Sequence, residues 1–157
     1  MPFRISLGNT HFPDTDRIHL YRQSSRPMQN RSPKILLVDD NDLMRTLLRG
    51  ILRSESCQVV GEAKNGLIAL DLIERVLPDV VFLDVMMPEM DGLEALQNIK
   101  EKHPEIRVIM ITGNPSVENV QESIQGGASG FIVKPFNTAK VLDTLHKTLD
   151  NMSRETQ

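Results

Sequence analysis

The apolar residues after position 33 alternate between two patterns. Residues 35–38 are apolar at every position, and residues 43–52 then carry apolar side chains at intervals of three and four. A short continuous apolar run is typical of a buried strand, whereas the second spacing is typical of an amphipathic helix. The later runs lie at 59–60, 80–83, 108–111 and 131–133, and the later helical spacings at 67–77, 93–99, 117–124 and 141–149. The sequence therefore predicts five strands and five helices in strict alternation.

The predicted strands are apolar throughout, which indicates burial on both faces in a parallel sheet covered by helices. Because crossovers are right-handed, few topologies remain. An α/β, flavodoxin-like (βα)5 doubly wound parallel sheet with strand order 2-1-3-4-5 is favoured. Pro78 is expected to end the second helix, Asp91 to cap the third, and Gly126-Gly127 to end the fourth. Only 24 residues follow position 133, so we expect one last helix and no DNA-binding domain.

The composition excludes several classes of protein. Of 157 residues, 39% are hydrophobic and 25% are charged, as in a globular domain. The net charge of -3 supplies no general attraction to nucleic acid or to anionic membranes. The single cysteine, Cys57, excludes an intramolecular disulfide framework. No long apolar run and no signal-peptide pattern is present, so we expect a cytoplasmic protein without membrane contact.

The first 32 residues differ from the rest of the chain. They hold five arginines and two aspartates, a net charge of +3, whereas residues 33–157 have a net charge of -6. Residues 1–32 show no sustained helical or strand period, so we expect a basic, disordered extension before one domain at 33–157. Two alternatives stay open: an arm that binds nucleic acid with Tyr21 available for stacking, and translation that begins at Met28.

Polar residues fall where the predicted strands end. Asp39 and Asp40 follow the first strand, and Asp84, Thr112 and Lys134 end the third, fourth and fifth strands. Each of them alone is equally typical of a helix cap, a turn residue or a solvated charge. In an open parallel sheet, however, the carboxyl ends of the strands form one crevice in which ligands bind. We therefore expect the five side chains to share one site.

This set of residues suits phosphoryl transfer. Three carboxylates repel one another unless a cation neutralises them, and oxygen ligands in this number suit Mg²⁺. Mg²⁺, the Lys134 ammonium and the Thr112 hydroxyl would each contact an oxygen of a phosphoryl group. Asp84 is the expected nucleophile, because it ends the central strand and a carboxylate is already ionised at neutral pH. The product would be an acyl phosphate.

With these residues, the stretch 34–150 resembles the receiver domain of a two-component response regulator. The matching segments are Leu37-Val38-Asp39-Asp40-Asn41, Phe82-Leu83-Asp84-Val85-Met86-Met87-Pro88-Glu89-Met90-Asp91-Gly92, Thr112, and Lys134-Pro135-Phe136. The resemblance implies that Asp84 is the phosphorylated aspartate. It also implies that Asp40, Asp84 and the main-chain carbonyl of Met86 bind Mg²⁺ directly, and that Asp39 holds the ion largely through water.

The resemblance further implies a conformational switch. Thr112 would bond the phosphoryl group and shift toward it, and Lys134 would contact both the carboxylate and the phosphoryl group. The Lys134-Pro135 bond resembles the family's cis peptide. Phe131 falls at the family's aromatic switch position, and its inward turn would alter the face formed by the fourth helix, fifth strand and fifth helix. The alternative for Phe131 is an ordinary core residue.

These features favour a single-domain response regulator that accepts its phosphoryl group from a sensor histidine kinase or a phosphotransfer domain. It would catalyse only its own phosphorylation and autodephosphorylation, and it would signal to an unknown downstream protein. A phosphatase of the haloacid dehalogenase type needs a second aspartate where this chain has Met86. A pseudo-receiver, acting as an interaction module independent of phosphorylation, is the remaining alternative. The sequence leaves open whether the switch face also forms a homodimer.

Overall fold

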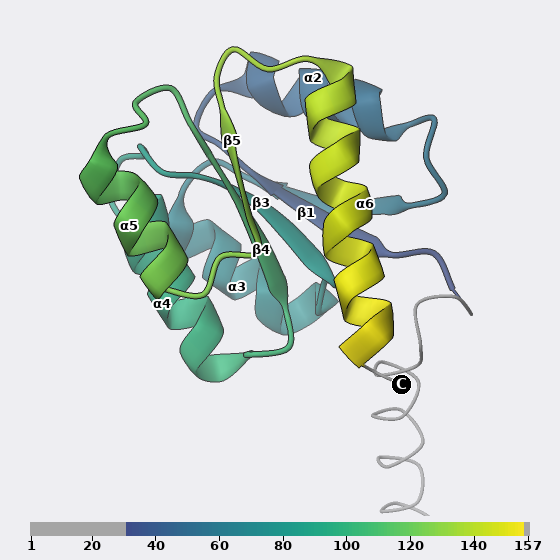
Figure 1. Cartoon of the computed structure of the whole chain (residues 1–157). Helices are drawn as coiled ribbons and strands as arrows, with labels where there is room; N and C mark the ends of the chain where they lie inside the picture. Colours follow the sequence, from purple (N-terminus) through teal and green to yellow (C-terminus); the bar gives the residue numbers. More distant parts are fainter. Residues whose placement is uncertain (1–30, 156–157) are drawn as a thin grey trace, which may run out of the picture.

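The computed structural model describes residues 31–155, which fold around a five-stranded parallel sheet (Figure 1). The strands are β1 (Lys34–Val38), β2 (Gln58–Ala63), β3 (Val80–Asp84), β4 (Arg107–Thr112) and β5 (Gly130–Val133). The helices are α2 (Asp42–Leu52), α3 (Gly66–Val76), α4 (Gly92–Lys102), α5 (Val117–Gln125) and α6 (Thr138–Glu155). The strand order is β2-β1-β3-β4-β5, and all neighbouring strands are parallel. The predicted fold class and strand order are confirmed.

Helices cover both faces of the sheet (Figure 1). Helices α2 and α6 lie on one face, and α3, α4 and α5 lie on the other. Each face has its own apolar core, and consecutive strand residues such as Phe82 and Leu83 belong to opposite cores because side chains alternate along a strand. All five residues of β3 are buried, which explains the unbroken apolar run. None of the helices within residues 31–155 is long and apolar enough to cross a bilayer.

Capping side chains set the starts of the helices. Asn41, Asn65 and Asp91 precede α2, α3 and α4, and a side-chain oxygen of each accepts a hydrogen bond from a backbone N–H of the first turn. The predicted cap at Asp91 is confirmed. The end of α3 differs from the prediction: Leu77 lies beyond the helix in the left-handed conformation, with φ 45°. The left-handed cap at Leu77 therefore closes the helix before Pro78 is reached.

Arg31 attaches the beginning of the described chain to the amino edge of the sheet. Two of its guanidinium nitrogens donate to the two carboxylate oxygens of Asp79, at 2.8 and 2.7 Å. The same carboxylate accepts the backbone N–H of Lys34 at 2.7 Å, so Asp79 holds together the start of β1 and the residue three positions before it. The predictions for the extension, including those for Tyr21 and Met28, concern positions 1–30 and lie outside the described residues.

Candidate functional site

Four strands deliver polar residues to the carboxyl edge of the sheet. Asp39 follows β1, Asp84 ends β3, Thr112 ends β4, and Lys134 follows β5. These strands are consecutive in the sheet, so the four positions lie along one rim. Main-chain hydrogen bonds extend the ladder to the rim: the Lys134 N–H donates to the Thr112 carbonyl at 2.8 Å, and the Asp39 N–H donates to the Ala63 carbonyl at 3.0 Å. The fold thus brings together residues that lie up to 95 positions apart in the sequence.

The ammonium of Lys134 lies between two buried carboxylates. Its Nζ is 2.9 Å from Oδ2 of Asp39 and 3.5 Å from Oδ2 of Asp84. The side chains of Asp39 and Asp84 are 2% and 4% exposed, so water screens these ion pairs little. Burial lowers the pKa of Lys134, but its bonds to Asp39 and Asp84 outweigh burial, and the net pKa is raised. Lys134 is therefore cationic throughout the physiological range.

Burial and repulsion from Asp39 destabilise the ionised form of Asp84 more than the Lys134 ammonium stabilises it. Burial and, after it, the neighbouring Asp39 raise the pKa of Asp84 to about 6. The Lys134 ammonium and the backbone N–H of Met86, which lies 3.4 Å from Asp84 Oδ1, act in the opposite direction. At pH 7 the carboxylate is still mostly ionised, and it is destabilised enough to favour a cation nearby.

The carboxylates of Asp39, Asp40 and Asp84 can offer oxygens to one cation. One oxygen from each lies within 4.8 Å of the other two. Asp39 and Asp84 are buried whereas Asp40 is exposed, so such an ion would have protein ligands on one side and water on the other. Oxygen-only ligands with open positions for water are typical of Mg²⁺. The donor set and its excess of negative charge thus fit the predicted ion.

Thr112 contributes a buried hydroxyl to the rim. Its side chain is fully buried, and Oγ1 accepts a hydrogen bond from the backbone N–H of Asn114 at 3.0 Å. A hydroxyl that accepts one bond keeps its own proton for donation. Thr112 can therefore donate to an oxygen that enters the crevice. Met86, the predicted third metal ligand through its carbonyl, lies in the loop after β3, and 57% of its surface is exposed.

After this loop, Gly92 lies against the main chain of Asp84. The Gly92 N–H donates to the Val85 carbonyl at 2.8 Å. A Cβ placed on Gly92 would lie 2.0 Å from the main-chain carbonyl oxygen of Asp84, so no larger residue fits without moving the backbone. Glu89 in the same loop adopts φ 71°, and its carboxylate accepts the side-chain amide of Asn65 at 3.1 Å. The loop that carries Asp84 into α4 is thus fixed at both ends.

Phe131 lies partly buried on β5, the edge strand. Its partner on β4 is Met110, and its side chain packs against the core on the α3, α4 and α5 side of the sheet. Three residues later the Lys134-Pro135 peptide is cis, as predicted. This position of Phe131 is compatible with both sequence interpretations, the switch residue and the core residue.

Sequence reasoning did not single out Arg45 at this site. The arginine lies on α2, and its Nη1 donates to the main-chain carbonyl of Asp39 at 2.5 Å. In the sequence, Arg45 is one of several charged residues between the apolar positions of a helix, which is the ordinary pattern of a solvated face. The informative signal, a buried partner on another element, exists only in the folded chain.

The fold and the site together define a class: doubly wound α/β proteins with a cluster of carboxylates and a lysine at the carboxyl edge of the sheet. Within this class, the sequence profile of the response regulator receiver domain matches residues 35–146. The chemotaxis protein CheY of Listeria monocytogenes is 46% identical over 114 residues, which are 73% of this chain and 96% of that protein. The chain belongs to the family of response regulator receiver domains.

Solved structures agree with this assignment. A CheY-like response regulator receiver domain protein from Methanospirillum hungatei superposes with a TM-score of 0.75 at 31% identity, covering 79% of this chain and 98% of that one. The CheX-CheY-BeF3-Mg²⁺ complex from Borrelia burgdorferi contains a chain that superposes with a TM-score of 0.71 at 35% identity, covering 73% of this chain and 87% of that one. That complex contains Mg²⁺ and a CheX partner.

Proposed function

We propose that this protein is a response regulator that accepts a phosphoryl group on Asp84 in a Mg²⁺-dependent reaction. The donor would be a sensor histidine kinase or a phosphotransfer protein, and the modified domain would signal to a downstream partner. One observation carries the proposal: Asp39, Asp40 and Asp84 converge at the rim, and the Lys134 ammonium lies against two of them. A cytoplasmic location stays a prediction from the sequence.

Asp84 would act as the nucleophile. One of its carboxylate oxygens attacks the phosphorus of a phosphohistidine, and the P–N bond breaks with its electron pair returning to the imidazole nitrogen. Because the pKa of Asp84 is about 6, the carboxylate is already mostly ionised at pH 7 and needs no general base. The position two residues later holds Met86, which offers no acid or base, so hydrolysis as a turnover phosphatase is not supported.

The neighbouring groups would stabilise the charge that spreads over the phosphoryl oxygens. When bound at Asp39, Asp40, Asp84 and the Met86 carbonyl, Mg²⁺ would supply neutralising charge to these oxygens. Lys134 would exchange its 3.5 Å contact with Asp84 for a contact with a phosphoryl oxygen. Thr112 would donate its free hydroxyl proton to another.

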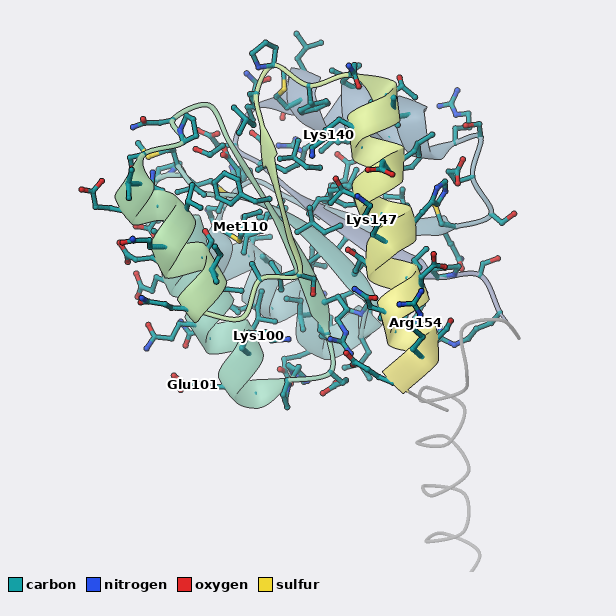
Figure 2. The ribbon with its side chains drawn as sticks, in the orientation of Figure 1. Lys100, Glu101, Met110, Lys140, Lys147 and Arg154 are labelled. Atoms are coloured by element: carbon teal, nitrogen blue, oxygen red, sulfur yellow. The ribbon has the colours of Figure 1, made fainter. Side chains whose placement is uncertain are left out.

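The output surface would be the α5–β5–α6 face, the solvent-exposed side of these three elements. Movement of Thr112 toward the phosphoryl group would leave space that Phe131 enters, because the two residues lie on the adjacent strands β4 and β5. Val117, Ile124 and Val133 expose 68%, 67% and 43% of their surface. Lys140 and Lys147 lie on α6 (Figure 2). Exposed apolar and basic side chains on these elements suit a protein partner, and a second copy of the chain is the other candidate occupant.

Intact-protein mass spectrometry tests the phosphoacceptor. The full chain is incubated with a small acyl phosphate, with and without Mg²⁺, as wild type, as Asp84→Asn and as Asp71→Asn. Asp71 is the matched control, an exposed aspartate on α3 outside the rim. We expect one phosphoryl group on wild type and on Asp71→Asn, only with Mg²⁺, and none on Asp84→Asn.

Two outcomes would contradict the proposal. The first is modification of Asp84→Asn to the level of wild type. The second is no modification of wild type even when histidine kinases are supplied as donors. In the second case a partner that binds wild type and Asp84→Asn equally would support the pseudo-receiver, the interaction module that needs no phosphorylation.

A further inference from the structure

We propose that Arg45 is a positioning residue for the Mg²⁺ site, which it serves by fixing the peptide between Asp39 and Asp40. This inference rests on the proposed function. Arg45 lies one turn into α2, and its side chain is only 14% exposed. Its guanidinium group spans three elements: it donates to the Asp39 carbonyl at the rim, to Glu62 on β2, and to Asp42 at the start of α2.

The hydrogen bond from Arg45 is one of four that hold Asp39 in place. The Asp39 N–H donates to Ala63, Oδ1 accepts the Asn41 N–H at 2.8 Å, and Oδ2 accepts the Lys134 ammonium at 2.9 Å. The main-chain carbonyl is the remaining polar group, and Arg45 Nη1 lies 2.5 Å from it. Every polar group of Asp39 therefore has a partner, and each partner comes from a different position in the chain.

The fixed carbonyl also limits where Asp40 can point. The Asp39 carbonyl belongs to the planar peptide that joins Asp39 to Asp40, so its orientation fixes where the Asp40 nitrogen and Cα lie and narrows the directions open to the Asp40 side chain. Within residues 31–155, no hydrogen bond or ion pair holds the exposed Asp40 carboxylate itself. Its position in the cluster therefore depends on the peptide that Arg45 holds.

Glu62 fixes the guanidinium group in turn. Its Oε1 accepts Arg45 Nε at 3.0 Å, and its Oε2 pairs with Arg49 one turn further along α2. The planar guanidinium can donate to Glu62 from Nε and to the Asp39 carbonyl from Nη1 at the same time. A lysine at this position has a single donor group and cannot reach both acceptors in this geometry. The function of Arg45 thus depends on its shape as well as on its charge.

The experiment separates positioning from charge and from folding. Isothermal titration with MgCl2 measures the Mg²⁺ dissociation constant of the full chain at pH 7, and urea denaturation in EDTA measures its stability. The first variant is Arg45→Lys, which keeps the charge but loses the separate Nε and Nη1 donors of the guanidinium group. The second is Arg49→Lys, the matched control, because Arg49 also pairs with Glu62 but lies one helical turn further from Asp39. Outer-sphere partners of metal ligands contribute about 10- to 100-fold to affinity, and we expect the lower figure for a main-chain contact.

Arg45→Lys is therefore expected to raise the Mg²⁺ dissociation constant about tenfold, and Arg49→Lys less than twofold, at similar urea midpoints. Equal dissociation constants for wild type and Arg45→Lys would overturn the inference, as would equal weakening by the two variants. Should Arg45→Lys fail to fold, Glu62→Gln, which keeps an acceptor for Nε, takes its place with an expected weakening of a few fold. Failure of wild type to bind Mg²⁺, or binding by Asp84→Asn as tight as by wild type, would instead refute the proposed function.

Discussion

Asp84→Asn is expected to make the metal-free protein more stable at pH 7, although it removes the central residue of the site. Burial and the Asp39 carboxylate raise the pKa of Asp84 to about 6, and the side chain is only 4% exposed. A pKa of about 6 in place of the ordinary value of about 4 means that ionised Asp84 opposes folding by about 3 kcal/mol at pH 7. Asparagine resembles the neutral acid in shape and polarity. We therefore expect a gain of about 2 kcal/mol in the free energy of unfolding.

The gain should depend on pH in a defined direction. Between about pH 4, where the carboxyl of an unfolded chain titrates, and about pH 6, the folded state holds more protons than the unfolded state. Below this window Asp84 is neutral and does not oppose folding. As the pH rises through the window, wild type loses stability because Asp84 becomes ionised more easily in the unfolded state than in the folded state. Asparagine does not titrate, so its advantage over wild type should grow by about 1 kcal/mol between pH 5 and pH 7.

Urea denaturation in EDTA, followed by far-UV circular dichroism at both pH values, measures this difference. Comparison of the two proteins at the same pH cancels the titration of all other groups. Lys134→Met should change stability in the opposite direction. It leaves the buried carboxylates of Asp39 and Asp84 without the cation between them and should lower stability at pH 7. Excess Mg²⁺ should stabilise wild type by about 2 to 3 kcal/mol at 100 times its dissociation constant and leave Asp84→Asn unchanged. An Asp84→Asn protein that is less stable than wild type in EDTA, or a difference that is the same at both pH values, would refute the reasoning.

Two further predictions concern the backbone around the site and the amino edge of the sheet. Gly92→Ala should lower the free energy of unfolding by at least about 3 kcal/mol in urea denaturation, because the new Cβ meets the carbonyl oxygen of Asp84. Gly50→Ala, in open space on α2, should raise it by about 0.5 to 1 kcal/mol, and equal effects of the two would contradict the steric argument. Arg31→Ala should cost about 1 to 2 kcal/mol, because it leaves the Asp79 carboxylate with fewer donors in a site where that side chain is 10% exposed; an unchanged urea midpoint would show the contact to be incidental.

The fold was predictable because its signals are local. The inner strands β1, β3 and β4 each contain a run of four consecutive apolar residues, such as 80–83, and burial on both faces of a parallel sheet requires that composition at each position separately. The edge strand β2 is only partly buried and has a shorter apolar run, at 59–60. The start of α4 at Asp91 was predictable for the same reason, because a cap bonds to an N–H only three residues away. The prediction made α3 one residue too long, because nothing in the local sequence marks Leu77 for the left-handed conformation.

The identities of the candidate site residues also came from the sequence. A parallel sheet gathers strand ends on one rim, so Asp39, Asp84, Thr112 and Lys134 could be expected together before any contact was known. Their properties could not be read in the same way. The raised pKa of Asp84 arises from burial and from Asp39, which lies 45 positions earlier, and such effects depend on distances and on solvent exclusion.

Local composition was thus enough to set the order of the strands and helices and the set of residues at the rim. The tertiary structure was needed for features in which folding brings atoms within a few ångströms of one another. These are the contact of Lys134 with two carboxylates, the close approach of Gly92 to Asp84, and the bond from Arg45 to the Asp39 carbonyl. The physical reason is one of range. Hydrophobic periodicity acts between residues a few positions apart, whereas the electrostatic and steric terms that tune the site act through space and appear only once packing has fixed the distances.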